Sequence, residues 1–268
     1  MDRESTADLT RTERIGLALG AGIADRRLPR ALASMWQDNF SFPVLGLTLN
    51  DRLFAEGLDH VPQGESFIFA ANHRTWFDLY AVMIATWRRF PQPPHLYCPV
   101  RTAFFYEKPA GIALNLLVSG NAMYPPVFRD QRGKILNQYA VERAVELLRA
   151  DRRCVLAIHP EGRRNPSPDP YSFLPAKPGV GRIALQSGRP VIPAFVAGLP
   201  PTFPELVRER VSGRGTPVRV HLGPPVPLAD FTNADAPEAW QAATDRVMGH
   251  IAALGAQDRA FMARRERT

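Results

Sequence analysis

Cysteine is scarce in this sequence of 268 residues, in which Cys98 and Cys154 are the two examples. Two thiols are too few for a disulfide framework or for a cysteine-rich zinc site. The sequence also shows no secretory signal, and proteins that lack one stay in compartments where thiols are kept reduced. We therefore expect a cytoplasmic protein.

Long apolar runs are missing as well. The longest run near the N-terminus, residues 15–24, has ten residues, whereas a membrane-spanning helix needs about 20. We expect a protein that can touch a membrane without crossing it. The apolar fraction of 45% is ordinary for a globular chain with a sizeable buried core.

Negative charge is in deficit, because 26 acidic residues face 33 lysines and arginines, which gives a net charge of +7. Such a surplus favours an anionic partner, which can be nucleic acid, an acidic membrane surface or a phosphorylated substrate. Lysine-rich runs and RNA-binding signatures are absent. We therefore expect no nucleic-acid partner.

The first 44 residues are predicted to form a helical segment. Two short apolar stretches, residues 15–24 and 31–36, are separated by charged residues and Pro29. Amphipathic helices of this kind lie at a membrane interface or cover a protein core, and the pattern leaves both readings open. Residues 45–268 are expected to form one further domain, which ends in a helix.

Strands and helices alternate along residues 45–268, which predicts an α/β fold with a central, mostly parallel or mixed sheet flanked by helices. Strands are expected at residues 45–49, 66–71, 96–100, 154–158, 191–196 and 218–222. Helices are expected at residues 78–90, 110–118, 133–150 and 179–187, and from about residue 237 onward.

Two polar residues, His73 and Glu161, each follow a predicted strand. Ligands of such sheets gather where loops leave the carboxyl ends of the strands, so we expect both residues in one cleft. The proline-rich residues 165–178 are predicted to form a loop over or beside that cleft.

The sequence Asn-His-Arg-Thr-Trp-Phe-Asp begins at Asn72 and places His73 five positions before Asp78, across a turn that enters a helix. A carboxylate that accepts from one ring nitrogen of a histidine strengthens the other nitrogen as a base. His73 can then remove the proton of an alcohol that attacks a thioester. Taken alone, the pair also fits a packed histidine and an acid at a helix N-terminus.

Four ordered blocks resemble the glycerolipid acyltransferase family, the PlsC-like 1-acylglycerol-3-phosphate and lysophospholipid acyltransferases. Residues 72–78 match its Asn-His-x4-Asp signature, and residues 158–165 (Ile-His-Pro-Glu-Gly-Arg-Arg-Asn) are similar to its Pro-Glu-Gly-Thr-Arg-Ser block. Lys-Pro-Gly-Val-Gly-Arg at residues 177–182 and Pro-Val-Ile-Pro-Ala at residues 190–194 resemble the two later blocks. The resemblance covers about residues 45–225 and is far more specific than one short motif.

This resemblance implies a glycerol-3-phosphate acyltransferase-like fold and transfer of a fatty acyl group from acyl-CoA or acyl-carrier protein. The acceptor would be the free hydroxyl of an anionic lysophospholipid, above all 1-acylglycerol-3-phosphate, in phospholipid biosynthesis. His73 would be the general base and Asp78 its partner. The resemblance implies neither a cofactor nor a metal. The substrate-binding residues that it implies are Arg129, Glu161, Gly162, Arg163, Arg164 and Lys177.

Arginines suit such an acceptor because guanidinium groups bind phosphate bidentately, and Gly162 would let the backbone approach the ligand. Glu161 is expected to orient an arginine or to accept from a substrate hydroxyl, unless it only forms a structural ion pair. Arg163 stands where the family usually has threonine. That difference keeps glycerol phosphate and other lyso-lipids open as acceptors.

Two readings from other classes compete with an acyltransferase at a membrane surface. One is a non-catalytic membrane-binding homologue, against which the intact His73 and Asp78 argue. The other is a metal-dependent esterase that would use His159 together with His73, Asp78 and Glu161 as ligands. The sequence has no close-spaced histidine pair or cysteine ligand to support that metal site.

Overall fold

The computed structural model describes residues 9–49, 52–128 and 133–265. Six strands form a central sheet in the order β1-β8-β7-β2-β6-β3. All neighbouring strands run parallel except β7 and β8. The strands are β1 (Leu53–Glu56), β2 (Phe67–Ala71), β3 (His95–Tyr97), β6 (Cys154–Ile158), β7 (Val191–Ala197) and β8 (Val218–Leu222). This mixed α/β sheet confirms the predicted fold class.

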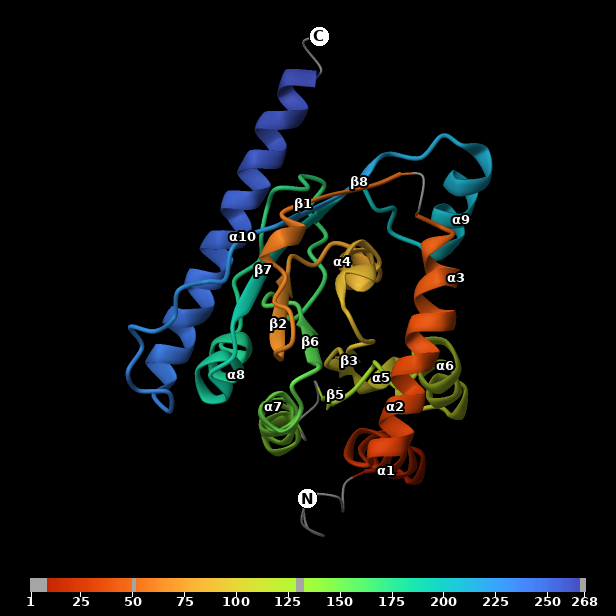
Figure 1. Ribbon diagram of the computed structural model, residues 1–268, viewed down its shortest axis with the longest axis vertical. Coiled ribbons are helices and arrows are strands. Elements are labelled where there is room, and N and C mark those ends of the chain that lie inside the picture. The colour runs from red at the N-terminus through yellow and green to blue at the C-terminus, as the bar shows by residue number, and fades with distance from the viewer. Residues whose placement is uncertain (1–8, 50–51, 129–132, 266–268) are drawn as a thin grey trace.

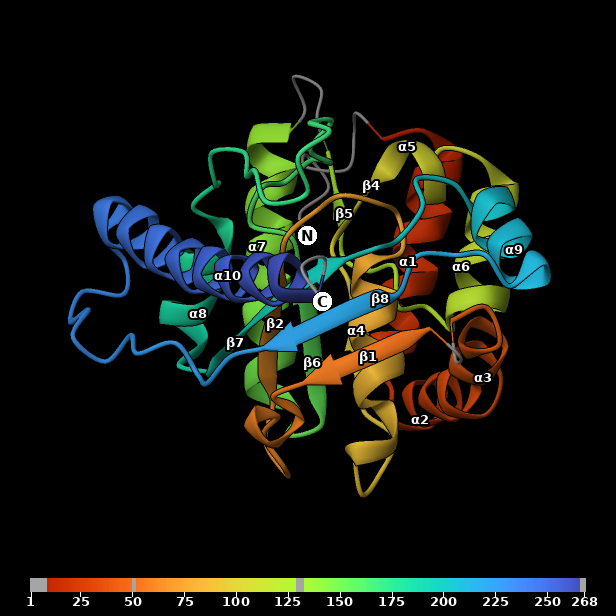
Figure 2. The ribbon, with the colours of Figure 1, turned by 90° about the horizontal axis from the view of Figure 1, so that it is seen from above.

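Helices cover both faces of the sheet (Figure 1). One face carries α7 (Gly133–Ala150), α8 (Gly179–Ser187) and α10 (Pro237–Arg265), and the other carries α4 (Asp78–Thr86). Figure 2 shows the two groups on opposite sides of the strands. Further elements after the N-terminal segment are η2 (Leu58–His60), η3 (Trp87–Arg89), α5 (Thr102–Phe105), α6 (Pro109–Ser119), α9 (Phe203–Ser212) and the strand pair β4 (Val100–Arg101) and β5 (Pro126–Val127).

The central strand β2 shows why the sheet is buried on both sides. All five of its residues are buried and apolar, as expected for a parallel strand between two helical layers. Ile68 and Ala70 belong to the core with α7, α8 and α10, whereas Phe67 and Phe69 belong to the core with α4. Alternate residues of β2 therefore face the two helical layers, as the period of two in a strand requires. His73 lies two residues after the end of β2.

The N-terminal segment is helical from α1 (Arg11–Asp25) through α2 (Arg27–Trp36) and the π-helical η1 (Gln37–Ser41) to α3 (Phe42–Gly46). A capping box between Thr10 and Glu13 begins α1. Among the described residues, no helix is long and apolar enough to cross a membrane.

The strand predicted at residues 45–49 is wrong, because residues 42–46 are helical and the first strand begins at Leu53. Phe42, Leu45 and Leu49 recur at helical spacing and contact the core on the α4 side. A short apolar run does not distinguish a strand from a buried helix, and this one continues the preceding helix.

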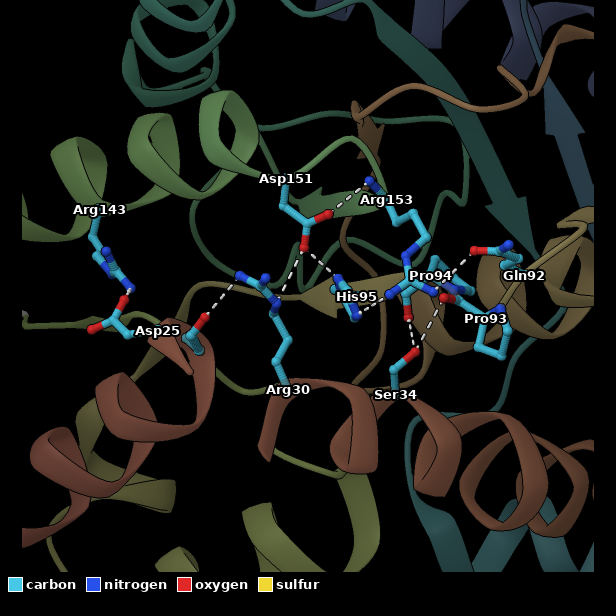
Figure 3. A network of polar contacts seen from close by, with 11 residues as sticks. Asp25, Arg30, Ser34, Gln92, Pro93, Pro94, His95, Arg143, Asp151 and Arg153 are labelled. Carbon is cyan, nitrogen blue, oxygen red and sulfur yellow. Dashed lines mark hydrogen bonds and ion pairs between the residues drawn. The ribbon is translucent and has the colours of Figure 1, made fainter. Parts of the chain in front are cut away.

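A buried polar network attaches α2 to the amino ends of the parallel strands (Figure 3). Asp151, just before β6, accepts from Nδ1 of His95 at the start of β3, and Nε of Arg30 lies 3.3 Å from the same carboxylate oxygen. The Ser34 hydroxyl donates to the carbonyl of Pro94 at 2.8 Å. The N-terminal helices are therefore packed against the sheet rather than detached from it.

Candidate active site

The site lies at the carboxyl ends of β2 and β6, which are neighbouring parallel strands. The His73 backbone N–H after β2 donates to Oε1 of Glu161 after β6 at 2.9 Å. The predicted proximity of these two residues is confirmed. The side chain of Asn72 pairs with the backbone of Val196 in β7, donating at 2.9 Å and accepting at 2.7 Å, and so fixes the point where the chain leaves the sheet.

His73 and Asp78 face each other across the turn, with His73 Nδ1 3.2 Å from Asp78 Oδ2. The backbone N–H groups of Arg74 and Thr75 donate to the same oxygen at 2.6 and 2.7 Å, and the Thr75 hydroxyl donates to Oδ1 at 3.0 Å. Burial raises the pKa of Asp78, and the nearby His159 and these hydrogen bonds oppose that rise. Asp78 is thus both the first residue of α4 and the partner of His73.

This hydrogen bond assigns the tautomer of His73. When Asp78 is ionised, Nδ1 carries the proton that it donates, and Nε2 carries the lone pair. The His73 side chain is 15% exposed, whereas that of Asp78 is 1% exposed. The pair therefore combines a shielded carboxylate with an imidazole that solvent can reach, as a general base requires.

His159 stacks face to face on His73, with ring centroids 3.7 Å apart and planes 7° apart. Its Nδ1 donates to the carbonyl of Ala71 at 3.0 Å. Burial, together with the smaller effect of the neighbouring His73, lowers the pKa of His159 to about 3. His159 is therefore neutral at ordinary pH, and the sequence had suggested only a metal-ligand role for it.

His73, Asp78 and His159 each offer a ligand atom within 4.8 Å of the others. Their geometry does not suit a metal ion. The lone pairs of the two nearly parallel imidazoles lie in their ring planes and do not converge on one point. The Asp78 oxygens already accept from backbone and hydroxyl donors.

Glu161 joins the turn at residues 72–78 to the loop at residues 165–178. Its side chain is buried, and while Oε1 accepts from His73, Oε2 accepts from the backbone N–H of Leu174 at 2.9 Å. Burial raises its pKa, and both hydrogen bonds oppose that rise. The N–H of Asn165 donates to the His73 carbonyl at 2.8 Å, so the loop lies beside the site as predicted. The sequence placed Asn165 in the family-like block and at the start of this loop, without a role of its own.

The predicted phosphate-binding residues lie at the edge of this site where the structure describes them. Gly162 has a left-handed backbone conformation (φ +65°), and the Lys177 side chain passes beside it. Arg163, Arg164 and Lys177 are exposed. The Arg164 guanidinium lies 4.4 Å from the ring centroid of Trp76. Arg129 lies outside the described residues.

Residues 52–197, more than half of the chain, match the family model described as "Acyltransferase". The chain belongs to the acyltransferase family. It is 26% identical to 1-acyl-sn-glycerol-3-phosphate acyltransferase alpha from Ovis aries, over 73% of this chain and 60% of that protein. The Homo sapiens protein of the same name is also 26% identical, over 73% of this chain and 61% of its own length.

The fold of this acyltransferase-family chain also has a match among solved structures, the 1-acyl-sn-glycerophosphate (LPA) acyltransferase PlsC from Thermotoga maritima. The TM-score is 0.53 at 21% sequence identity, with 90% of this chain and 87% of that chain covered. This likeness concerns the fold. The chain spans about 60% of the length of the curated relatives that it matches.

Proposed function

We propose that this protein transfers a fatty acyl group from a thioester, acyl-CoA or acyl-carrier protein, to the free hydroxyl of 1-acylglycerol-3-phosphate in phospholipid biosynthesis. The observation that carries the proposal is the His73–Asp78 hydrogen bond, set at the carboxyl ends of β2 and β6 in a chain of the acyltransferase family. The named function of the mammalian relatives supports this choice of acceptor.

In the proposed reaction, Nε2 of His73 takes the hydroxyl proton while the hydroxyl oxygen attacks the thioester carbonyl carbon. The resulting imidazolium is stabilised by Asp78. The tetrahedral intermediate then expels the thiolate, which takes the proton back from His73, so the ester and the free thiol are the products. No covalent acyl-enzyme and no cofactor are needed in this scheme.

Binding of the acceptor phosphate is assigned to the exposed cations beside Gly162. Arg164 offers a planar fork that suits phosphate, Arg163 precedes it in the chain, and the Lys177 side chain lies beside Gly162. Arg129 is assigned the same role by the resemblance alone. Glu161 acts indirectly in this proposal, because both of its oxygens accept from backbone N–H groups.

The N-terminal segment supports peripheral contact with a membrane on the cytoplasmic side. Its helices expose large apolar side chains, and α6 beside them exposes more; Trp36 Nε1 donates to the carbonyl of Leu117, which holds the two together. These exposed side chains are Ile15, Leu19, Leu28, Leu32, Met35, Trp36, Phe40, Val44, Leu114, Leu117 and Val118. Exposed arginines accompany them at positions 11, 14, 26 and 27. Such a surface suits anionic lipid.

Membrane contact is tested by sedimentation with vesicles that contain anionic phospholipid. The double variant Leu28→Glu/Leu32→Glu should lose binding, because two charges would enter the apolar layer. Phe261→Glu is the matched control and should bind as the wild type does, because Phe261 belongs to the C-terminal part of α10, which Figure 1 shows far from α1 and α2. Equal binding by the wild type and both variants would show that the N-terminal helices do not contact the membrane.

The activity is tested by free-thiol release from acyl-CoA or acyl-carrier protein, with and without 1-acylglycerol-3-phosphate. Release should require the acceptor, and His73→Ala should abolish it while the protein stays folded. Unchanged release by His73→Ala would refute the mechanism. Loss of thiol release with a chelator would favour the metal-dependent esterase. Release that occurs with glycerol phosphate or another lyso-lipid, and not with 1-acylglycerol-3-phosphate, would identify that compound as the acceptor instead.

A further inference from the structure

His159 stacks on His73, and the proposed acid–base reaction gives this contact no role. The two residues follow neighbouring parallel strands, in which Ala70 of β2 is aligned with Ile158 of β6. His159 therefore leaves the sheet beside Ala71, and its Nδ1–H donates to the Ala71 carbonyl at 3.0 Å. The His159 ring is thus attached to the strand that carries His73.

Contacts from three directions help to define the position of His73. Asp78 accepts from Nδ1 in the ring plane, Glu161 accepts from the backbone N–H, and His159 covers one face of the ring at 3.7 Å. The plane of an imidazole ring is set by rotation about its Cβ–Cγ bond. The flat ring of His159 opposes rotation of His73 toward that face, so it helps to keep Nε2 in one direction.

The charge of His159 is suited to this place. His73 becomes an imidazolium when it takes the hydroxyl proton, and a second protonated ring stacked on it would repel that charge. His159 keeps one proton, on Nδ1, because burial opposes a second. A neutral ring instead offers its π-face to the cation. Among the described residues, the carboxylates of Asp78 and Glu161 both contact His73, and the charge of Arg74 acts on Glu161.

We infer that His159 is a positioning residue, whose ring holds the plane of His73 so that Nε2 meets the acceptor hydroxyl. The inference rests on the proposed role of His73 as the general base. His159 neither gives up nor receives a proton during the reaction. What it contributes is a flat, neutral surface on one side of the catalytic imidazole.

Two substitutions test the contribution of the His159 ring separately from that of its hydrogen bond to Ala71. His159→Phe keeps a flat ring and loses the donor to Ala71, whereas His159→Gln keeps an N–H donor and loses the ring. We expect His159→Phe to retain kcat within about threefold and His159→Gln to lose about tenfold, the size of a cation–π or orientation effect at a partly buried site. KM for the acceptor should change by less than about twofold in both, because ground-state binding is untouched.

A measurement without substrate keeps this test separate from the proposed function. The Nδ1–H proton of His73, hydrogen-bonded to Asp78, should give a low-field NMR signal in the wild type and in His159→Phe. In His159→Gln the signal should broaden, because a mobile ring exchanges this proton with water. Thermal unfolding of each variant controls for folding.

The inference is overturned if His159→Gln has wild-type kcat and a sharp low-field signal, or if His159→Phe is as slow as His159→Gln. If the wild type releases no thiol with any acceptor while the NMR signals behave as expected, the proposed function fails and the positioning of His73 by His159 stands. The two failures are therefore distinguishable.

Discussion

Two histidine–aspartate pairs lie at opposite ends of the same parallel strands. His73–Asp78 follows β2, at the carboxyl ends, and His95–Asp151 lies where β3 and β6 begin. In both, Nδ1 of the histidine faces Oδ2 of the aspartate. The pairs are therefore alike in their central hydrogen bond and differ in what surrounds it.

The surroundings separate a candidate catalytic pair from a structural one. The His95 side chain is 3% exposed, against 15% for His73. Nε2 of His95 accepts from Arg153 at 3.1 Å, which occupies its lone pair, and Arg30 joins the same carboxylate. A buried pair enclosed by arginines fixes elements together, whereas an imidazole that solvent can reach is suited to proton transfer.

The largest effect should come from replacing the two histidines in turn. His73→Gln should lower kcat about 100-fold to 10,000-fold, the usual contribution of a general base. His95→Gln should leave kcat per folded molecule within about twofold, because it lies at the other end of the strands. Steady-state thiol release, normalised to folded protein by circular dichroism, makes the comparison. Equal losses in both variants would show that the two pairs do not have separate roles.

Asp78→Asn should lower kcat about 100-fold, because an amide cannot stabilise the imidazolium as a carboxylate does. The substituted side chain would also bring its own NH2 donor close to the backbone N–H groups of Arg74 and Thr75, which donate to Asp78 in the wild type. The expected signature is a fall in kcat with the acceptor's KM nearly unchanged, measured by varying the acceptor at saturating donor. A variant that changed KM alone would assign Asp78 to binding.

Asp151→Asn should act on stability and leave catalysis intact. We expect a loss of about 1–3 kcal/mol in the free energy of unfolding, the cost of leaving buried donors poorly paired. Urea unfolding at neutral pH measures this loss, and turnover per folded molecule should stay at the wild-type level. A stable but inactive variant would contradict the structural role.

The same variant should change the acid dependence of stability. Burial alone would raise the pKa of Asp151, but hydrogen bonds from His95 and the Arg153 N–H, with the charge of Arg30, hold it below its usual range. A carboxyl with a lowered folded-state pKa stabilises the protein above its unfolded pKa of about 4, and this stability is lost as the pH falls further. Between about pH 5 and pH 3 the wild type should therefore lose more stability than Asp151→Asn does.

The smallest effect concerns the cations around each pair. Arg30 is committed to Asp151, whereas Arg164 is exposed and stacks on Trp76. Arg164→Ala should raise the acceptor's KM about tenfold with little change in kcat, the loss of one charge-assisted contact. Arg88→Ala is the matched control, because Arg88 stacks on Trp87 beyond the other end of α4. An unchanged KM in Arg164→Ala would remove it from the phosphate site.

The sequence predicted the contacts that are close along the chain. His73 and Asp78 are five positions apart, so one turn at a helix start brings them together, and the strand pattern predicted that Glu161 would lie beside them. His159 was visible in the sequence, but its stacking depends on the register between β2 and β6. The pairing of Asn72 with Val196 spans 124 positions, and no local pattern indicates it.

The wrong and missing predictions likewise concern features that the local sequence pattern does not determine. The apolar run at residues 45–49 has β-prone composition, and only its continuation from the preceding helix decides its conformation. Helix α9 was not predicted, although Thr202 caps it by accepting from the Glu205 N–H. The roles of Arg163, Arg164 and Lys177 in phosphate binding stay predictions.

The burial of β2 has a consequence for how the protein loses activity. The strand lies between β6 and β7 with every residue covered on both faces, so its backbone amides should be among the last to exchange with deuterium. His73 follows this strand directly, and Asn72 extends its pairing. In a denaturant titration, turnover and the protection of the β2 amides should therefore disappear together, while the ends of α10 and the exposed loops exchange much earlier.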